Sequence, residues 1–384
     1  MKKRFEALDA FRGICALSVV VLHMRLIGSI TELSFFRGSS ILVEFFFVLS
    51  GFVLTHGYAY KDNLKFSTFM KSRFFRLYPL HLFMFFVMFT LEIGKLLAYK
   101  FGGFVFNNIP FTNAFAIQEI IPNLLLIQSW TPYTDPHTFN YPSWSISIEF
   151  YMYALFFGSI VTCRKNMVAA WIVSSLAAFV LIYSQSSLLT SEVLRGISCF
   201  FGGAFTYHLF VRTSAFKLNR AVGTGIEILL LSMIVIVVQS TFDQRSSVAS
   251  MLFMVTVFFF AFEFGAISRI LNAKPFQVIG KLSYSIYMTH AAILFCLIST
   301  AVIVQKATGI PFAPMIEGMR NLDFGGAIIN NSIVLIIIVI VIAISSITYK
   351  YIELAGQRLN SSSAMALSNG TLKRIKPVIN QPSA

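Results

Sequence analysis

Residues 328–352 read IINNSIVLIIIVIVIAISSITYKYI, and the first charged side chain in this stretch is Lys350. A helix needs about 20 mainly apolar residues to cross a bilayer, so the stretch predicts a membrane-spanning helix. The same window applied along the chain predicts nine more spans. They lie near 10–28, 40–58, 78–98, 144–162, 168–184, 193–211, 224–240, 248–263 and 282–303. The pattern is typical of an all-α polytopic membrane protein with about ten transmembrane helices.

The composition of the whole chain agrees with a membrane protein. Hydrophobic residues make up 57% of the 384 positions and charged residues only 12%, against roughly a quarter in soluble proteins. This excludes a disordered chain, a nucleic-acid-binding module and a small disulfide scaffold. The four cysteines show neither CxxC pairing nor metal-ligand spacing, so we expect no metal site and no permanently bound cofactor.

The distribution of positive charge predicts the orientation. With ten spans, 21 of the 30 Lys and Arg residues fall on the side of the N-terminus and eight on the other side, with Arg12 inside the first span. Lys and Arg accumulate in cytoplasmic loops, so both termini are expected in the cytoplasm. The net charge of +14 therefore reflects topology and contact with membrane lipid, not a nucleic-acid partner.

The chain divides into one transmembrane domain, 1–358, and a tail. The longest connection, 99–143, contains several Gly, Asn and Pro residues and is expected outside the membrane. Residues 359–384 are rich in Ser and Asn, so we expect a disordered cytoplasmic tail.

Polar side chains inside spans are functional candidates because they are expensive to insert. Arg12 and His23 lie eleven residues apart, which is only about 20° beyond three full turns, so they share one face about 16 Å apart along the helix. Arg12 is expected near the cytoplasmic end and His23 deeper. The alternatives are that Arg12 snorkels to the interface and that His23 is a packed structural histidine.

Two arginines precede the third span. Arg73 and Arg76 are three residues apart, so they lie on one helix face where the chain enters the membrane. Two such planar donor groups are suited to phosphates, and a CoA thioester is a candidate ligand because the sequence has no Gly-rich nucleotide loop. The alternative is that they are simple positive-inside anchors.

Four further residues are candidates. Glu149 lies about two turns into the fourth span, where a buried carboxylate requires a partner such as an Arg, a His or a substrate hydroxyl. Glu44, Trp144 and His290 are candidates for substrate contacts or for structural polar contacts, and His290 in particular fits a hydrogen-bonded structural network.

The motifs that contain these residues occur in a familiar order. They read LDAFRGICALSVVVLH (8–23), VEFFFVLSGFVLT (43–55), SRFFRLYP (72–79), SWSISIEFYMY (143–153) and SYSIYMTH (283–290), with YIE (351–353) at the end of the last span. In this order the chain resembles the acyltransferase-3 family of integral membrane acyltransferases over about residues 8–354. One departure is that Glu353 is followed by Leu354-Ala355, where the family commonly has a Pro.

The resemblance implies an O-acyltransferase of the bacterial inner membrane. Such enzymes move an acyl group, usually acetyl, from cytoplasmic acyl-CoA to a carbohydrate such as O-antigen lipopolysaccharide or exopolysaccharide. It places the family's Arg-ten residues-His pattern on Arg12 and His23, and its double-arginine pattern on Arg73 and Arg76. The three arginines would hold the phosphates of acetyl-CoA, the donor substrate.

The resemblance leaves the chemical step open. His23 would act as a base toward the acceptor hydroxyl or as a nucleophile that first takes the acyl group. Glu149 would orient the acceptor or stabilise the imidazolium form of His23. The rival function is a transporter or flippase for a glycolipid or polysaccharide, and a third is an acyltransferase that releases a soluble small molecule.

Overall fold

The computed structural model describes residues 4–360 except 105, 107 and 317, and the chain is about 75% helical. Its helices of five or more residues are α1 (Glu6–His23), α2 (Ser34–Gly38), α3 (Val43–Leu54), α4 (Phe66–Gly102), α5 (Ile120–Leu124), α6 (Ser143–Thr162), α7 (Met167–Tyr183), α8 (Ser191–Arg212), α9 (Arg220–Gln239), α10 (Arg245–Phe260), α11 (Ala266–Leu271), α12 (Lys274–Thr308) and α13 (Ala327–Thr348). Short helical turns are η1 (Ile30–Glu32), η2 (Ser39–Leu42), η3 (Thr55–Ala59), η4 (Asn113–Phe115), η5 (Ile117–Glu119) and η6 (Tyr349–Glu353), and β1 (Met315–Ile316) pairs with β2 (Met319–Arg320) in an antiparallel hairpin.

Each of the ten predicted spans coincides with a helix. Six helical segments among the described residues are long and apolar enough to cross a membrane: Ser34–Ala59, α4, α6, α9, α12 and Ala327–Asn360. Helices α7 and α10 are apolar but shorter. The nearly all-α membrane architecture is confirmed, whereas the count of ten crossings and the cytoplasmic termini stay predictions.

Helix α4 is much longer than the predicted span 78–98, with 37 residues from Phe66 to Gly102. Nothing in the preceding segment FSTFMKSRFFR breaks a helix, so the helix continues beyond the apolar run toward the N-terminal side. Arg73 and Arg76 therefore lie within a continuous helix. The predicted tail, 359–384, lies outside the described residues from 361 onward, and residues 359–360 are helical.

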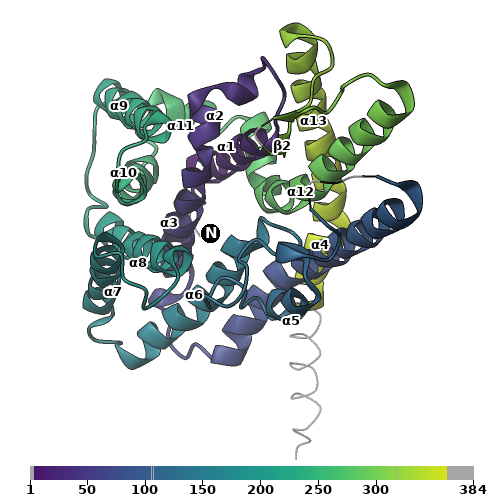
Figure 1. Cartoon of the computed structure of the whole chain (residues 1–384). Helices are drawn as coiled ribbons and strands as arrows, with labels where there is room; N and C mark the ends of the chain where they lie inside the picture. The colour runs from purple at the N-terminus through teal and green to yellow at the C-terminus, as the bar shows by residue number, and fades with distance from the viewer. Residues whose placement is uncertain (1–3, 105, 107, 317, 361–384) are drawn as a thin grey trace, which may run out of the picture.

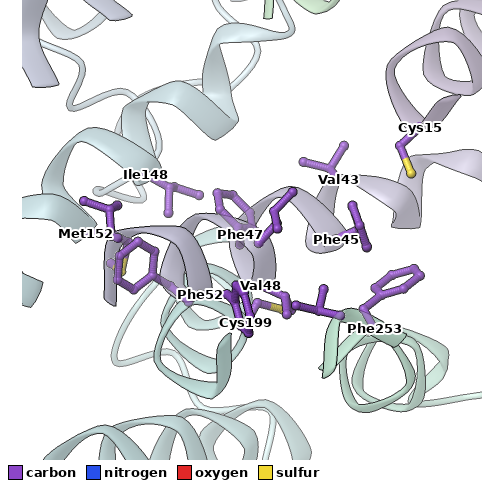
Figure 2. Packing of buried hydrophobic residues seen from close by; sticks show 14 of the residues in the cluster. Cys15, Val43, Phe45, Phe47, Val48, Phe52, Ile148, Met152, Cys199 and Phe253 are labelled. Carbon is purple, nitrogen blue, oxygen red and sulfur yellow. The ribbon is translucent and has the colours of Figure 1, made fainter. Parts of the chain in front are cut away.

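Helix α3 lies at the centre of the molecule, with α7 to α10 on one side and α4, α12 and α13 on the other (Figure 1). Its side chains Phe45, Phe47 and Phe52 are at most 2% exposed. Figure 2 shows them packed among residues of α6, α8 and α10, such as Met152 and Phe253. Because α3 is apolar and surrounded, it is a core helix of this bundle.

Two glycines set the contact between α1 and α12. A methyl group added at Gly13 would lie 2.6 Å from the backbone nitrogen of Gly280, and one added at Gly280 would meet the Asp9 carbonyl. The two backbones thus touch without side chains between them, as small residues allow in membrane helices. His23 and His290 each lie ten residues after the glycine of their own helix and lie together, so the helices run parallel.

Candidate active site

The imidazole ring of His23, at the C-terminal end of α1, lies next to that of His290, in the middle of α12. Their centroids are 5.2 Å apart. In each, Nδ1 lies 2.8 Å from a carbonyl of the same helix, Val19 for His23 and Tyr287 for His290. A carbonyl oxygen only accepts hydrogen bonds, so Nδ1 carries the proton in the neutral ring and Nε2 is left as an acceptor. The structure thus places two Nε2 acceptors in one site.

The histidine pair lines a cavity of about 190 Å³, here called the outer cavity. The centroid of the Tyr141 ring lies 4.6 Å from the centroid of the His23 ring and 5.4 Å from that of the His290 ring. His137 also lines the outer cavity. Aromatic faces beside nitrogen acceptors suit a small ligand that has both hydroxyl groups and C–H faces.

The segment that carries His137 and Tyr141 is held down at several points. The Asn123 side chain donates to the Thr138 carbonyl at 3.0 Å. Asn140 donates to the Met288 carbonyl of α12 at 3.1 Å, two residues before His290. The predicted extramembrane connection therefore forms one wall of the outer cavity.

Arg195 of α8 supplies a cation to the outer cavity. Its Nε donates to Glu44 at 2.7 Å, and its guanidinium lies 5.6 Å from the ring of Trp144. Glu44 is fully buried and also accepts hydrogen bonds from Ser246 and Ser250. Glu44 thus holds Arg195 in place and does not line the cavity, whereas Trp144 lines it.

A second, smaller cavity of about 40 Å³, here called the inner cavity, is lined by Arg12 and Glu149. Tyr287 lines both cavities, so the two are neighbours. Glu149 accepts hydrogen bonds from Ser50 and Tyr153, each at 2.5 Å. Among the described residues Glu149 has no hydrogen bond to His23, so the structure places it beside Arg12 and not beside the histidine pair.

A third cavity, of about 350 Å³ and here called the entrance cavity, is lined by Arg4, Tyr58 and Arg73. Arg73 donates to the hydroxyl of Tyr58 at 3.0 Å. Arg76, one turn further along α4, is partly buried. Its guanidinium interacts electrostatically with Glu353 and Glu149.

The three cavities follow one another along helix α1. Asp9 lines the entrance cavity, Arg12 the inner cavity and His23 the outer cavity. The predicted shared face of Arg12 and His23 is consistent with this arrangement. Arg4, Arg73 and Arg12 therefore line the cavities toward the N-terminal end of α1, and the histidine pair lies at its other end together with Arg195.

Several residues of the site escaped the sequence reasoning. Arg195 lies within the predicted span 193–211, and a charged side chain inside a span is a usable signal. Glu353, at the end of the last predicted span, is 4% exposed and accepts a hydrogen bond from Ser285 at 3.0 Å. For His137 and Tyr141 no local signal existed, because they belong to a connection without periodicity.

The sequence of this chain is similar to those of known proteins. A family model described as an acyltransferase domain, acyltransferase-3, matches residues 5–350. Acyltransferase MdmB of Streptomyces mycarofaciens is 34% identical over 167 residues, 40% of this chain and 38% of that protein. Protein 2 in picA locus of Rhizobium radiobacter is 41% identical over 85 residues, 21% of this chain and 41% of that protein.

Each of these matches spans well under half the length of the curated relative. No solved structure matches the chain. The family model, in contrast, covers nearly the whole chain, from the entrance cavity through the histidine pair to the last helix. The chain therefore belongs to the acyltransferase-3 family.

Proposed function

We propose that this protein is a multi-pass O-acyltransferase of the bacterial inner membrane. It moves an acetyl group from cytoplasmic acetyl-CoA to a hydroxyl of a cell-surface glycan or of its lipid-linked precursor. The observation that carries the proposal is the row of cavities along α1, with Arg73 and Arg12 in the first two and the pair of imidazole acceptors in the third. Family membership supports the reaction type.

The donor end of the path suits an anionic, elongated ligand. Arg73 lines the entrance cavity and Arg12 the inner cavity, and guanidinium groups bind phosphates through paired donors. In the proposal Arg73 and Arg76 hold the phosphates of acetyl-CoA. The pantetheine arm extends past Arg12, which brings the thioester toward the histidine pair.

In the proposed chemical step His23 is the general base. Its Nε2 takes the proton of the acceptor hydroxyl, and the hydroxyl oxygen forms a bond to the thioester carbonyl carbon. The carbon–sulfur bond then breaks, and the CoA thiolate leaves and receives the proton from His23. The bond from Nδ1 to the Val19 carbonyl keeps the ring in the tautomer that this step needs.

An acetyl-enzyme route uses the same atom, because the His23 Nε2 lone pair would attack the thioester first. Incubating the purified protein with labelled acetyl-CoA in the absence of acceptor separates the two routes. We expect no stable label on His23 for direct transfer. Label recovered on a peptide that contains His23 would replace direct transfer with the two-step route.

The function itself is tested with His23→Gln and His23→Ala. Gln keeps a hydrogen bond but cannot take a proton near neutral pH, so both variants should lose acetyl transfer by about 10²–10⁴-fold. The readouts are consumption of acetyl-CoA and ester formation on the glycan, at matched protein levels. Transport of a glycolipid without any consumption of acetyl-CoA would favour the rival transporter. Near-normal transfer by His23→Gln would make His23 structural.

The direction of the path across the membrane is tested with reporters. A reporter fused after residue 360 should report the cytoplasm, and one inserted within 104–116 should report the opposite side. A swapped result would put the entrance cavity, with Arg73, on the side of the membrane opposite to cytoplasmic acetyl-CoA.

A further inference from the structure

The Nε2 atom of His290 is a hydrogen-bond acceptor without a donor among the described residues. The side chain is fully buried. Leaving a buried polar atom unpaired costs about 1–3 kcal/mol, so such atoms are usually satisfied by a ligand or a water. Since His290 lines the outer cavity, a molecule in that cavity is in place to supply the missing donor.

The ring of His290 is held in an orientation in which Nε2 finds no hydrogen-bond donor from the described residues. Its Nδ1 is engaged with the Tyr287 carbonyl at 2.8 Å, and the glycine contact between α1 and α12 keeps both helices in place. The ring beside it belongs to His23, whose Nε2 is likewise an acceptor in the neutral form. Two acceptors cannot bond to each other, so the pair requires two donors from outside.

One of these donors is already assigned by the proposed function, on which this inference rests. It is the hydroxyl that His23 deprotonates. A ligand that also supplies the second donor must do so from a group close to the first, because the two ring centroids are only 5.2 Å apart. Hydroxyls on neighbouring carbon atoms of a sugar ring meet this requirement.

We propose that His290 binds the acceptor by accepting a hydrogen bond from the hydroxyl next to the one that is acylated. The acceptor is accordingly a sugar with two neighbouring free hydroxyls, and the outer cavity selects one of them. Tyr141, whose ring lies close to both imidazoles, supplies an apolar face against the C–H groups of that sugar. His23 performs the proton transfer and His290 determines which hydroxyl reaches it.

The first test maps the acetyl ester on the surface glycans of the native host, by mass spectrometry and NMR, with and without the gene. We expect a gene-dependent ester on a carbon whose neighbour in the same ring carries a free hydroxyl. An ester on a hydroxyl without such a neighbour, or on a non-sugar product, overturns the inference and leaves acyl transfer intact. If purified protein consumes no acetyl-CoA with isolated glycan, the proposed function itself fails.

The second test compares His290→Leu with His290→Gln. Leu has no acceptor, so the ester yield should fall about 10- to 100-fold at matched protein levels and the preference between neighbouring positions should be lost. The Gln amide oxygen accepts a hydrogen bond but is no base, so Gln should restore much of the positional preference. A purely structural histidine would give no such rescue of position.

His81→Leu is the matched control. His81 is also fully buried, and one of its ring nitrogens has no partner among the described residues. Its other nitrogen bonds to the Asn123 carbonyl, but it lines none of the three cavities. Since His81 contacts Asn123, which holds Thr138 of the cavity wall, this variant should lose stability and some yield. It removes no acceptor from the outer cavity, so the acetylated position should not change. The inference is overturned if His290→Leu keeps the wild-type yield and position, or if His81→Leu alters the position equally.

Discussion

Replacing Gly13 by Ala tests whether the crossing of α1 and α12 sets the histidine pair. The added methyl group would lie 2.6 Å from the Gly280 backbone nitrogen and from the Ile279 carbonyl carbon. Van der Waals contact requires about 3.5 Å, and backbone atoms inside a helix cannot rotate away. The helices must therefore separate by about 1 Å. This overpacking should cost about 1–3 kcal/mol of stability.

The same separation should reach His23 and His290, which lie about 15 Å further along the two helices at 1.5 Å per residue. A displacement of about 1 Å at reacting groups can reduce a rate by about 10²-fold. We expect Gly13→Ala to insert and fold but to transfer acetyl groups about 10²-fold more slowly per folded molecule. Rates are measured with labelled acetyl-CoA in detergent, and folding by thermal unfolding of the same samples.

Gly158→Ala on α6 is the control, because apart from the backbone of its own helix no described part of the chain lies within 4 Å of the added methyl group. It should be neutral or more stable by up to about 1 kcal/mol, since Ala favours a helix more than Gly. If Gly13→Ala melts at a lower temperature but keeps the wild-type rate, the crossing is only a packing contact. If it matches Gly158→Ala in both measurements, the two backbones are not as close as described.

Three further outcomes are expected. Arg76→Ala should raise the KM for acetyl-CoA, and Arg76→Lys should bring the KM only partly back to the wild-type value because Lys lacks the planar guanidinium fork. Full activity of a variant lacking both Arg73 and Arg76 would make the two arginines simple positive-inside anchors. Glu44→Gln should destabilise the fold by about 1–3 kcal/mol, since Arg195, whose side chain is 25% exposed, loses its buried carboxylate partner. Adding Arg195→Met should recover thermal stability but not transfer. Asp323 lies outside the spans. Hydrogen bonds from the Asn330 side chain and from backbone amides lower the pKa of its carboxyl. Its contribution to stability is therefore present above its unfolded pKa of about 4 and is lost as the pH falls further, so Asp323→Asn should make stability depend less on pH at the acid end.

The sequence by itself determined the helices and the exceptional residues inside them. Whether a segment is apolar over about 20 residues is a local property, and so is the cost of placing Arg12, His23 or Glu149 inside such a segment. These could be recognised without knowing which helices are neighbours. The helix ends were less predictable, as α4 shows, because a helix can continue beyond its apolar run.

Only the tertiary structure decided the partners of these residues. For Glu149 the sequence predicted an Arg, a His or a substrate hydroxyl as partner, and the structure adds hydrogen bonds from Ser50 and Tyr153. Arg195 lies 151 positions from Glu44 in the sequence, and both are polar residues whose pairing depends on how α3 and α8 pack. A carboxylate in an apolar helix requires some partner, but the requirement does not specify which one.

The histidine pair shows most clearly that a sequence does not specify which residues become partners. His23 and His290 belong to the first and the twelfth α-helix, and each was a candidate by its own position in a span. They meet because Gly13 and Gly280 let two backbones touch at one point and because both histidines follow that point by ten residues. The contact is a property of two surfaces packed together, so no local pattern in either helix encodes it.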